Sequence, residues 1–419
     1  MKVKFDRVLR ESLSSNKVQE AKLESVPSIA SHEVIPMSSP TATPAAAPAL
    51  KQTALNATHR ALKAKMVDFG GWDMPVEYSG LMAEHLAVRN GVGLFDVSHM
   101  GEIQFRGPNS LAAVQRITMN DASRLKDGQA QYSALLTPEG TFVDDILVHK
   151  LGDNDYLLVV NAGTKDKDYA WIRKQVGSMA GIHISDYSGY YSQLAIQGPR
   201  ALETLQKLTK VDLTAIKNYW FTFGQVAGVH STLIARTGYS GEDGFEIYIP
   251  SDVATTVKVW NAVVEAGAEF GILPCGLGAR NTLRLEAGMP LYEHEITDQT
   301  NVFEAGLDRW LKLEKDSDFL GREALLAIKD SGGPARKLVG LEMMDRGIAR
   351  DGYPVLNQAG EQIGVVTSGS PAPFLKTNIA YAYVPRSVAE SKEDVFVQVR
   401  ANKVRAKQAP TPFYKRVKK

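Results

Sequence analysis

Three short segments hold polar side chains in places where they could do chemistry. The first covers residues 94–100 and contains Asp96 between Phe95 and Val97. Burial between apolar neighbours raises a carboxyl pKa unless a cation or a hydrogen-bond donor offsets it. Such a group suits proton transfer or the orientation of an amine. The simpler alternative is an Asp that caps a turn, and His99 nearby is expected to be a packed structural residue.

The second segment, residues 236–249, places a Gly-rich turn between two stretches that alternate like β-strands. The alternation puts Phe245, Ile247 and Ile249 on one face, so Glu246 lies on the other. A carboxylate beside such a turn can accept paired N–H donors from a heterocycle that approaches the backbone closely. A surface hairpin with Glu246 facing water is the alternative.

The third segment, residues 274–288, is expected to form a helix from Leu277 onward. Arg280 and Arg284 share one face of this helix. Arg280 could hold an acidic or polar ligand with its fixed set of donors, or it could form a surface ion pair. The glycines before it do not make a dinucleotide-binding loop, because Asn281 occupies the third glycine position.

The elements that must position these side chains form a mixed pattern from about Thr53 onward. Residues 156–160 and 194–196 are typical of buried strands. Residues 81–89 are expected to form a helix, after which a strand enters at 92–95 and continues toward Phe105. This mixture indicates an α+β fold, and no internal repeat is apparent.

Beyond Gly333-Pro334 the pattern changes to short strands separated by Gly and Pro turns. It indicates a small C-terminal β-barrel or sandwich. The expected strands cover residues 338–342, 361–367, 379–384 and 395–400. The expected organisation is a disordered N-terminal extension with a Pro/Ala-rich linker (1–52), a main α+β region (53–330) and a C-terminal barrel (331–419).

The composition excludes several classes of protein. The 419 residues are 44% hydrophobic and 23% charged, as in ordinary globular proteins, and a net charge of +1 does not suit a nucleic-acid binder. No apolar stretch approaches the ~18 residues of a membrane helix. The histidines are isolated and there is no CxxC motif, so no metal site is expected. Cys275 is the single cysteine, so no intrachain disulfide can form.

Charge is unevenly distributed along the chain. The last twenty residues, 400–419, contain eight basic side chains and no acidic one. They predict a solvated basic terminus or, alternatively, a local attractor for an anionic partner. The first ten residues are also basic, but Asp6 and Glu11 argue against a transit peptide. A cytoplasmic location is therefore expected, with the mitochondrial matrix as the alternative if the extension is a transit peptide.

Taken together and in this order, the segments resemble the aminomethyltransferase T-proteins of the glycine cleavage system, from Thr53 to the C-terminus. The most diagnostic parts are residues 96–100 and 238–244. The full set of matching stretches is 70–72, 74–76, 95–100, 160–163, 194–199, 237–244, 278–288, 304–307 and 364–369.

The resemblance implies a three-domain cloverleaf around a central folate cavity. It also implies a reaction in which the methylene of an aminomethyl group, held on the lipoyl arm of H-protein, passes to tetrahydrofolate with release of ammonia. Tetrahydrofolate would be the co-substrate and lipoylated H-protein the partner. No metal, nucleic acid or membrane is expected to take part.

Residue by residue, the resemblance assigns the central catalytic carboxylate to Asp96 and the pterin-binding carboxylate to Glu246. Near the C-terminus some members use a Tyr where this chain has Phe413, so the neighbouring Tyr414 is the expected folate contact. The other folate contacts would be Tyr239, Asn161, Arg280 and Met74.

Two other functions fit the same resemblance. One is a folate-dependent demethylase acting on a small methylated substrate. The other is a non-enzymatic folate-binding factor in iron–sulfur cluster maturation, whose relatives carry a cysteine where this chain has residues 236–242, which lack one. That difference favours the aminomethyltransferase.

Overall fold

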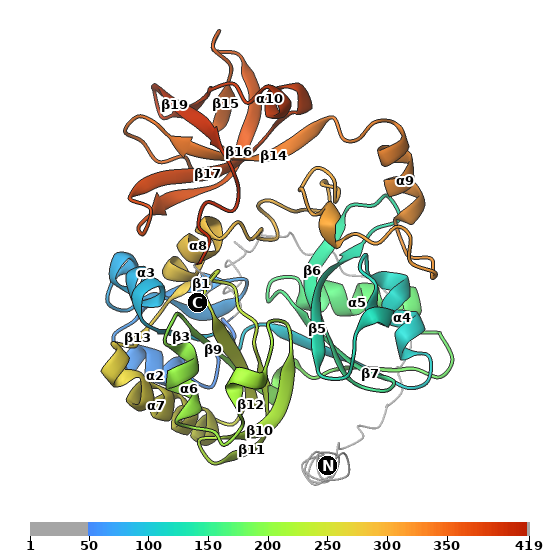
Figure 1. Ribbon diagram of the computed structural model, residues 1–419, viewed down its shortest axis with the longest axis vertical. Helices are drawn as coiled ribbons and strands as arrows, with labels where there is room; N and C mark the ends of the chain where they lie inside the picture. Colours follow the sequence, from blue (N-terminus) through green and yellow to red (C-terminus); the bar gives the residue numbers. More distant parts are fainter. Residues whose placement is uncertain (1–48, 417–419) are drawn as a thin grey trace, which may run out of the picture. The chain divides into compact units, whose positions relative to one another are not determined.

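The computed structural model describes residues 49–416, so nearly all of the predicted N-terminal extension lies outside the described residues. The described residues from Leu50 onward form one compact unit. Its described part contains a two-stranded ribbon, a five-stranded sheet, a six-stranded sheet and a closed six-stranded barrel (Figure 1). The predicted mixture of helices and sheets and the predicted C-terminal barrel are confirmed. No helix within residues 49–416 is long and apolar enough to cross a membrane.

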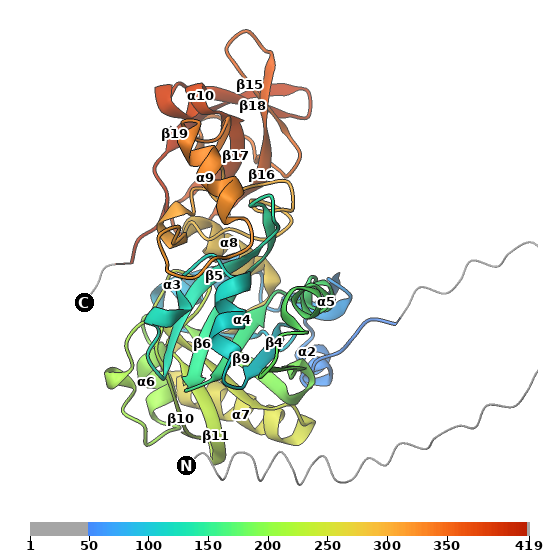
Figure 2. The ribbon, with the colours of Figure 1, turned by 90° about the vertical axis from the view of Figure 1, so that its right-hand side faces the viewer.

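The five-stranded sheet is antiparallel throughout, in the order β5-β6-β7-β4-β8. Helices α4 (Ser110–Ile117) and α5 (Lys165–Val176) pack side by side against it (Figure 2). Their apolar side chains join those of the strands in one core. The strands are β4 (Gly101–Arg106), β5 (Gln129–Leu136), β6 (Phe142–Gly152), β7 (Asp155–Val160) and β8 (His183–Asp186).

The six-stranded sheet has the order β10-β11-β12-β9-β3-β13. Helices α6 (Ala201–Gln206) and α7 (Val253–Gly267) cover it, and Trp260 of α7 is buried in the shared core. The strands are β3 (Gly93–Asp96), β9 (Tyr191–Gln197), β10 (Phe221–Val226), β11 (Val229–Ala235), β12 (Gly244–Pro250) and β13 (Leu273–Pro274).

The two sheets repeat one succession of elements: a strand, a helix, a 3-10 turn, a three-stranded meander, a helix and a last strand. A Gly-Pro pair precedes the first helix in both copies, at residues 107–108 and 198–199. The 3-10 turns are capped alike, by Asp121 in one copy and Asp212 in the other. The expectation of no internal repeat is therefore wrong, because the repeat is carried by topology and a few turn residues.

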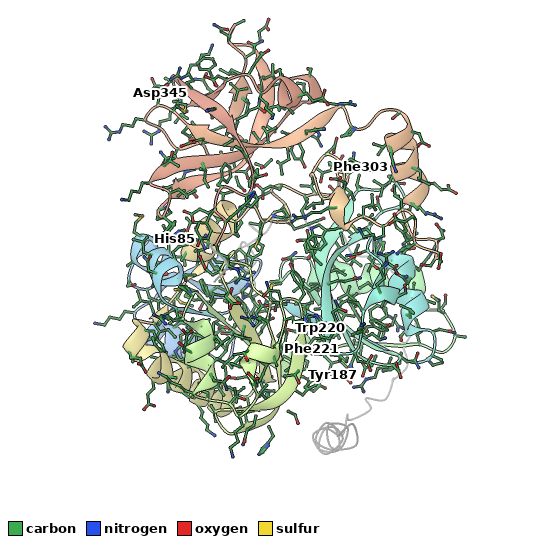
Figure 3. All side chains as sticks on the ribbon, in the orientation of Figure 1. His85, Tyr187, Trp220, Phe221, Phe303 and Asp345 are labelled. Atoms are coloured by element: carbon green, nitrogen blue, oxygen red, sulfur yellow. The ribbon has the colours of Figure 1, made fainter. Side chains whose placement is uncertain are left out.

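The two sheets adjoin at the starts of β5 and β10, where backbone hydrogen bonds link them. Ala130 N donates to Tyr219 O over 2.7 Å, and Phe221 N donates to Gly128 O over 2.8 Å. Figure 3 labels Trp220 and Phe221 at this junction. The side chains of β5 and those just before β10 therefore face a common space.

The segment after Asp96 differs from the prediction of one continuous strand. Strand β3 ends at Asp96, and β4 begins at Gly101 in the other sheet. The Asp96 carboxylate accepts a 2.9 Å hydrogen bond from Ser98 N, and Met100 N donates to Val97 O. This turn carries the chain from one sheet to the other.

The remaining elements of the main region flank the six-stranded sheet. Helix α3 (Leu81–Asn90) agrees with its prediction, and it packs against α8 (Leu277–Glu286), which was also predicted. Before α3 the chain forms α2 (Asn56–Ala61) and the ribbon of β1 (Lys65–Phe69) and β2 (Trp72–Glu77).

The barrel closes in the order β14-β17-β16-β15-β18-β19. The basic tail, predicted as a solvated terminus, supplies its last strand, in which Val404 and Ala406 point inward and Lys403, Arg405 and Lys407 outward. The elements here are α9 (Arg322–Asp330), β14 (Arg336–Met343), β15 (Pro354–Leu356), β16 (Gln362–Ala372), β17 (Thr377–Pro385), α10 (Arg386–Ser391), β18 (Val395–Val399) and β19 (Asn402–Ala409).

A buried ion pair joins helix α8 to the barrel. Arg284 Nη1 lies 2.6 Å from Glu295 Oε2, and Arg284 Nη2 donates to Ser368 Oγ of β16 over 2.7 Å. Thr367 Oγ1 donates to Glu295 Oε1 over 2.8 Å. Burial favours a higher pKa for Glu295, but Arg284 and the hydroxyls of Ser368 and Thr367 bring it below its ordinary value.

We expect Glu295→Ala to destabilise the fold by about 3–5 kcal/mol, because Arg284 would remain buried without its partner. Urea unfolding at pH 7 measures this loss. The double variant Arg284→Met/Glu295→Leu should recover most of it, and a double variant as unstable as the single one would contradict the assignment. The pKa of Glu295 is lower in the folded than in the unfolded protein. In the wild type, the contribution of the Arg284–Glu295 pair to stability is therefore complete above the ordinary carboxyl pKa and is lost as the pH falls through the lowered one.

Candidate functional site

A cavity of about 190 Å³ lies where the two sheets adjoin. Its wall combines flat aromatic surfaces with a few polar groups, as in pockets that hold planar heterocycles. The aromatic residues are Tyr132, Tyr219, Tyr239 and Trp310, and the polar ones are Asp145, Asn161, Gln193, Glu246, Arg280 and Arg309.

Glu246 reaches the cavity from the middle of β12. Phe245 and Ile247 on either side point into the core of the six-stranded sheet, so Glu246 must point the other way. It is only 6% exposed, and Thr237 Oγ1 donates a hydrogen bond to its Oε2. Burial raises the pKa of Glu246, and the Thr237 hydroxyl and the charge of Arg280 offset this only in part. The alternative of a carboxylate facing water is wrong.

Arg280 forms the electropositive part of the wall. It projects from α8, and its guanidinium lies 4.6 Å from the centre of the Tyr239 ring. The Tyr239 hydroxyl donates to the carbonyl of Pro290. Burial lowers the pKa of Arg280, while Tyr239, Glu246 and Asp145 favour its charged form. The pair offers a cation and an aromatic face in a fixed arrangement.

Asp145 is a cavity residue that the sequence analysis missed. Tyr132 Oη donates to its Oδ2 over 3.1 Å, and Asn161 Nδ2 donates to its Oδ1 over 2.9 Å. Burial and the neighbouring Asp144 raise the pKa of Asp145 to about 7. A carboxyl group with such a pKa can both take and give a proton near neutral pH. The signal in the sequence was the pair of adjacent acids within an apolar strand.

Asp96, the predicted catalytic carboxylate, does not line the cavity, although its neighbours Val97 and Met100 do. Both of its oxygens are bound by the protein: Thr53 Oγ1 donates to Oδ2 over 2.6 Å, His59 Nε2 lies 2.9 Å from Oδ2, and Ser98 N donates to Oδ1.

Burial favours a higher pKa for Asp96. The hydrogen bond and the charge of His59, together with the hydrogen bonds of Ser98 and Thr53, nevertheless bring this pKa below its ordinary value. These bonds fix the turn between the sheets, and the structure does not bring Asp96 together with Glu246.

Two further predicted contacts also lie away from the cavity. Met74 is fully buried in β2, and Tyr414 packs its ring 3.9 Å from the guanidinium of Arg89. Phe413 lies against Tyr381. Of the predicted residues, the cavity therefore brings together Glu246, Arg280, Tyr239 and Asn161.

Two family models match this chain. The model described as GCVT N-terminal domain matches residues 55–315. The model described as glycine cleavage T-protein C-terminal barrel domain matches residues 336–415, which contain the closed barrel.

Among curated proteins, the chain is 68% identical over 371 residues to the aminomethyltransferase of Acidobacterium capsulatum, covering 88% of this chain and 98% of that protein. It is 60% identical to the aminomethyltransferase of Koribacter versatilis, with 88% and 97% covered. Among solved structures it is similar to the glycine cleavage system aminomethyltransferase T from Bartonella henselae. The TM-score is 0.81 at 32% identity, with 87% of this chain and 98% of that chain covered.

We expect Thr53→Val to destabilise the protein by about 1.5–3 kcal/mol, because the buried Asp96 carboxylate would lose a donor. Thr53→Ser keeps the hydroxyl and is the matched control. Urea unfolding at pH 7 and pH 5 makes the measurement. Since the pKa of Asp96 is lowered in the fold, its contribution is lost as the pH falls, and the Val variant should begin to lose stability at a higher pH. Equal stabilities of the two variants would remove Thr53 from this role.

Proposed function

The chain belongs to the glycine cleavage T-protein family, and from that premise we propose how its cavity works. It is an aminomethyltransferase of the glycine cleavage system. We propose that tetrahydrofolate binds in the cavity. The methylene of the aminomethyl group on the lipoyl arm of H-protein is transferred there to tetrahydrofolate. Its bonds to sulfur and to the amine nitrogen are replaced by bonds to two nitrogens of tetrahydrofolate, which forms 5,10-methylenetetrahydrofolate and releases ammonia and the free lipoyl thiol.

The residues present fit a folate. The cavity offers a buried carboxylate at Glu246, a cation at Arg280 and flat aromatic walls at Tyr239 and Tyr219. Tetrahydrofolate, when bound, supplies the nitrogen nucleophiles that accept the methylene. Glu246 suits the N–H edge of a pterin because a carboxylate accepts two hydrogen bonds side by side. Arg280 holds its donors near this carboxylate and favours a ligand with acceptor atoms.

Asp145 is the carboxylate that we assign to proton handling. Its side chain lies in the same wall as Glu246, and two donors from Tyr132 and Asn161 fix both of its oxygens. A group held in this way can stabilise positive charge that develops on a nearby amine and can then take up the proton. Such a group is needed because the two folate nitrogens that bind the methylene each lose a proton, and the leaving amine and the leaving sulfur each take one up. Much of the acceleration would come from holding both reactants in one small, largely dry space.

The observation that carries this proposal is the convergence of four predicted residues from three separate segments, Glu246 and Tyr239 from one and Arg280 and Asn161 from two others, on one cavity. The test is an assay with aminomethylated carrier protein and tetrahydrofolate, with ammonia release as the readout. Turnover of a small methylated amine without ammonia release would instead indicate a folate-dependent demethylase. Folate binding without any turnover would indicate a non-enzymatic factor.

We expect Asp145→Asn to lower kcat by about 10²–10⁴ while folate binding is kept, because the variant cannot exchange a proton. Asp96→Asn is the informative comparison, since that residue remains the predicted catalytic carboxylate of the family resemblance. Its main effect should be on thermal stability. Single-turnover kinetics and folate titration distinguish the two, and a near-normal rate for Asp145→Asn beside a dead Asp96→Asn would reverse the assignment.

We expect Glu246→Gln to weaken folate binding by roughly 10–100-fold, the loss of one charged hydrogen-bond partner in a buried site. Fluorescence titration with tetrahydrofolate measures the dissociation constant. Glu242→Gln, in the same turn region but not in the cavity wall, is the matched control. Unchanged affinity in the Glu246 variant would place the pterin elsewhere.

A further inference from the structure

Behind the cavity wall lies a second pair of acids that the proposed reaction does not use. Strand β6 carries Asp144 and Asp145 in succession, so their side chains leave the strand on opposite faces. Asp145 faces the cavity, and Asp144 faces helix α5, where it meets Asp168. Asp144 and Asp168 are both fully buried. We call Asp144, Asp145 and Asp168 the acid cluster.

Asp144 is surrounded by donors. Asn161 N donates to its Oδ2 over 3.0 Å, Asn161 Nδ2 to its Oδ1 over 2.9 Å, and Thr164 Oγ1 to its Oδ2 over 2.9 Å. Both oxygens of Asp144 are therefore occupied by donors of the protein. The Asn161 amide also donates to Asp145, so it bridges the two neighbouring carboxylates.

Asp168 has the opposite environment. Among residues 49–416, neither of its oxygens has a well-formed hydrogen bond, because the Thr164 hydroxyl beside it donates to Asp144 Oδ2 and Asn161 O instead. Lys167, whose charge lowers the pKa of Asp168 slightly, directs its Nζ to Val143 O and the Tyr292 hydroxyl instead. A fully buried carboxylate without a partner is very costly, and so is a second negative charge beside Asp144. A proton on Asp168 resolves both problems, because a neutral acid can donate its O–H to Asp144.

We propose that Asp168 is a protonated acid whose O–H donates to Asp144, and that this bond holds Asp144 and the Asn161 bridge in the arrangement that makes Asp145 the proton carrier of the cavity. This inference rests on the proposed function of the cavity and makes Asp168 a positioning residue. Asp168 touches neither the cavity nor a substrate, and it acts through Asp144 and the Asn161 bridge.

The raised pKa values of Asp168 and Asp145 agree with this arrangement. Burial and the charge of Asp144 raise the pKa of Asp168 to about 10, against smaller effects of Thr164 and Lys167. Burial and the same charge raise the pKa of Asp145 to about 7. The other groups around Asp145 are Tyr132, Asn161, Tyr239 and Arg280, and those around Asp168 include Tyr292.

The first test is the pH dependence of kcat/KM for methylene transfer. Asp144→Asn removes the charge and should move the acidic limb down by about one pH unit or more. Asp168→Asn keeps a donor toward Asp144 and should leave the limb where it is in the wild type. Asp168→Leu has similar size but no donor, and it should move the limb by at least half a unit. Asn and Leu variants with the same limb would overturn the proposal.

The second test needs no activity. Infrared spectra of the folded wild type at pH 8 should contain a carbonyl band of a protonated, buried carboxylic acid that Asp168→Asn lacks. Burial also raises the pKa of Glu102, so Glu102→Gln is measured beside it to separate the two bands. No loss of intensity in Asp168→Asn would show that Asp168 is ionised and would end the proposal.

The two tests separate this inference from the proposed function. A wild type that binds no folate and transfers no methylene, but shows the Asp168 band, would refute the reaction and leave the protonated acid standing. Normal transfer without the band would refute the acid cluster alone. Thermal melting at pH 8 shows whether each variant is folded.

Discussion

The burial of carboxylates away from water is the constraint on which this site depends. Each one is reconciled with burial in its own way. Asp96 remains charged because Thr53, His59 and Ser98 surround it. At Glu246, burial outweighs the hydrogen bonds of Thr237 and Gln193 and the charge of Arg280, so its charged form is less well supported. The same cost of desolvation therefore gives a rigid structural anchor at one position and a group open to a ligand at another.

The cavity exists because two similar halves adjoin. Each half is a meander with helices on one face, so each leaves its other sheet face to be covered. The backbone bonds between β5 and β10 bring those faces together along one edge, and the turn after Asp96 ties them at another point. Aromatic side chains such as Tyr132 and Tyr219 then line a hollow that neither half could form alone.

Much of this was accessible from the sequence, and the failures have physical reasons. Helices α3 and α8 and several barrel strands follow from periodicity and turn residues. Glu246 follows from alternation within β12. Asp145 was missed because a strand buried on both faces shows no alternation, so the pattern did not indicate which of its two adjacent acids faces a cavity. The hydrogen-bond partners of Asp96 could not be predicted, because partners from residues as distant as Thr53 become visible only in three dimensions. Strand β19 was hidden by its charged outward face.

One helix touches both the cavity and the barrel. Arg280 faces the ligand space, and Arg284, one turn later, is fastened to Glu295 and to Ser368 of the barrel. An α-helix is a rigid element, because its backbone hydrogen bonds run nearly parallel to its axis. Helix α8 therefore links the two regions. The contacts of Arg284 with Glu295 and with the barrel restrain the helix, and with it the position from which Arg280 enters the cavity.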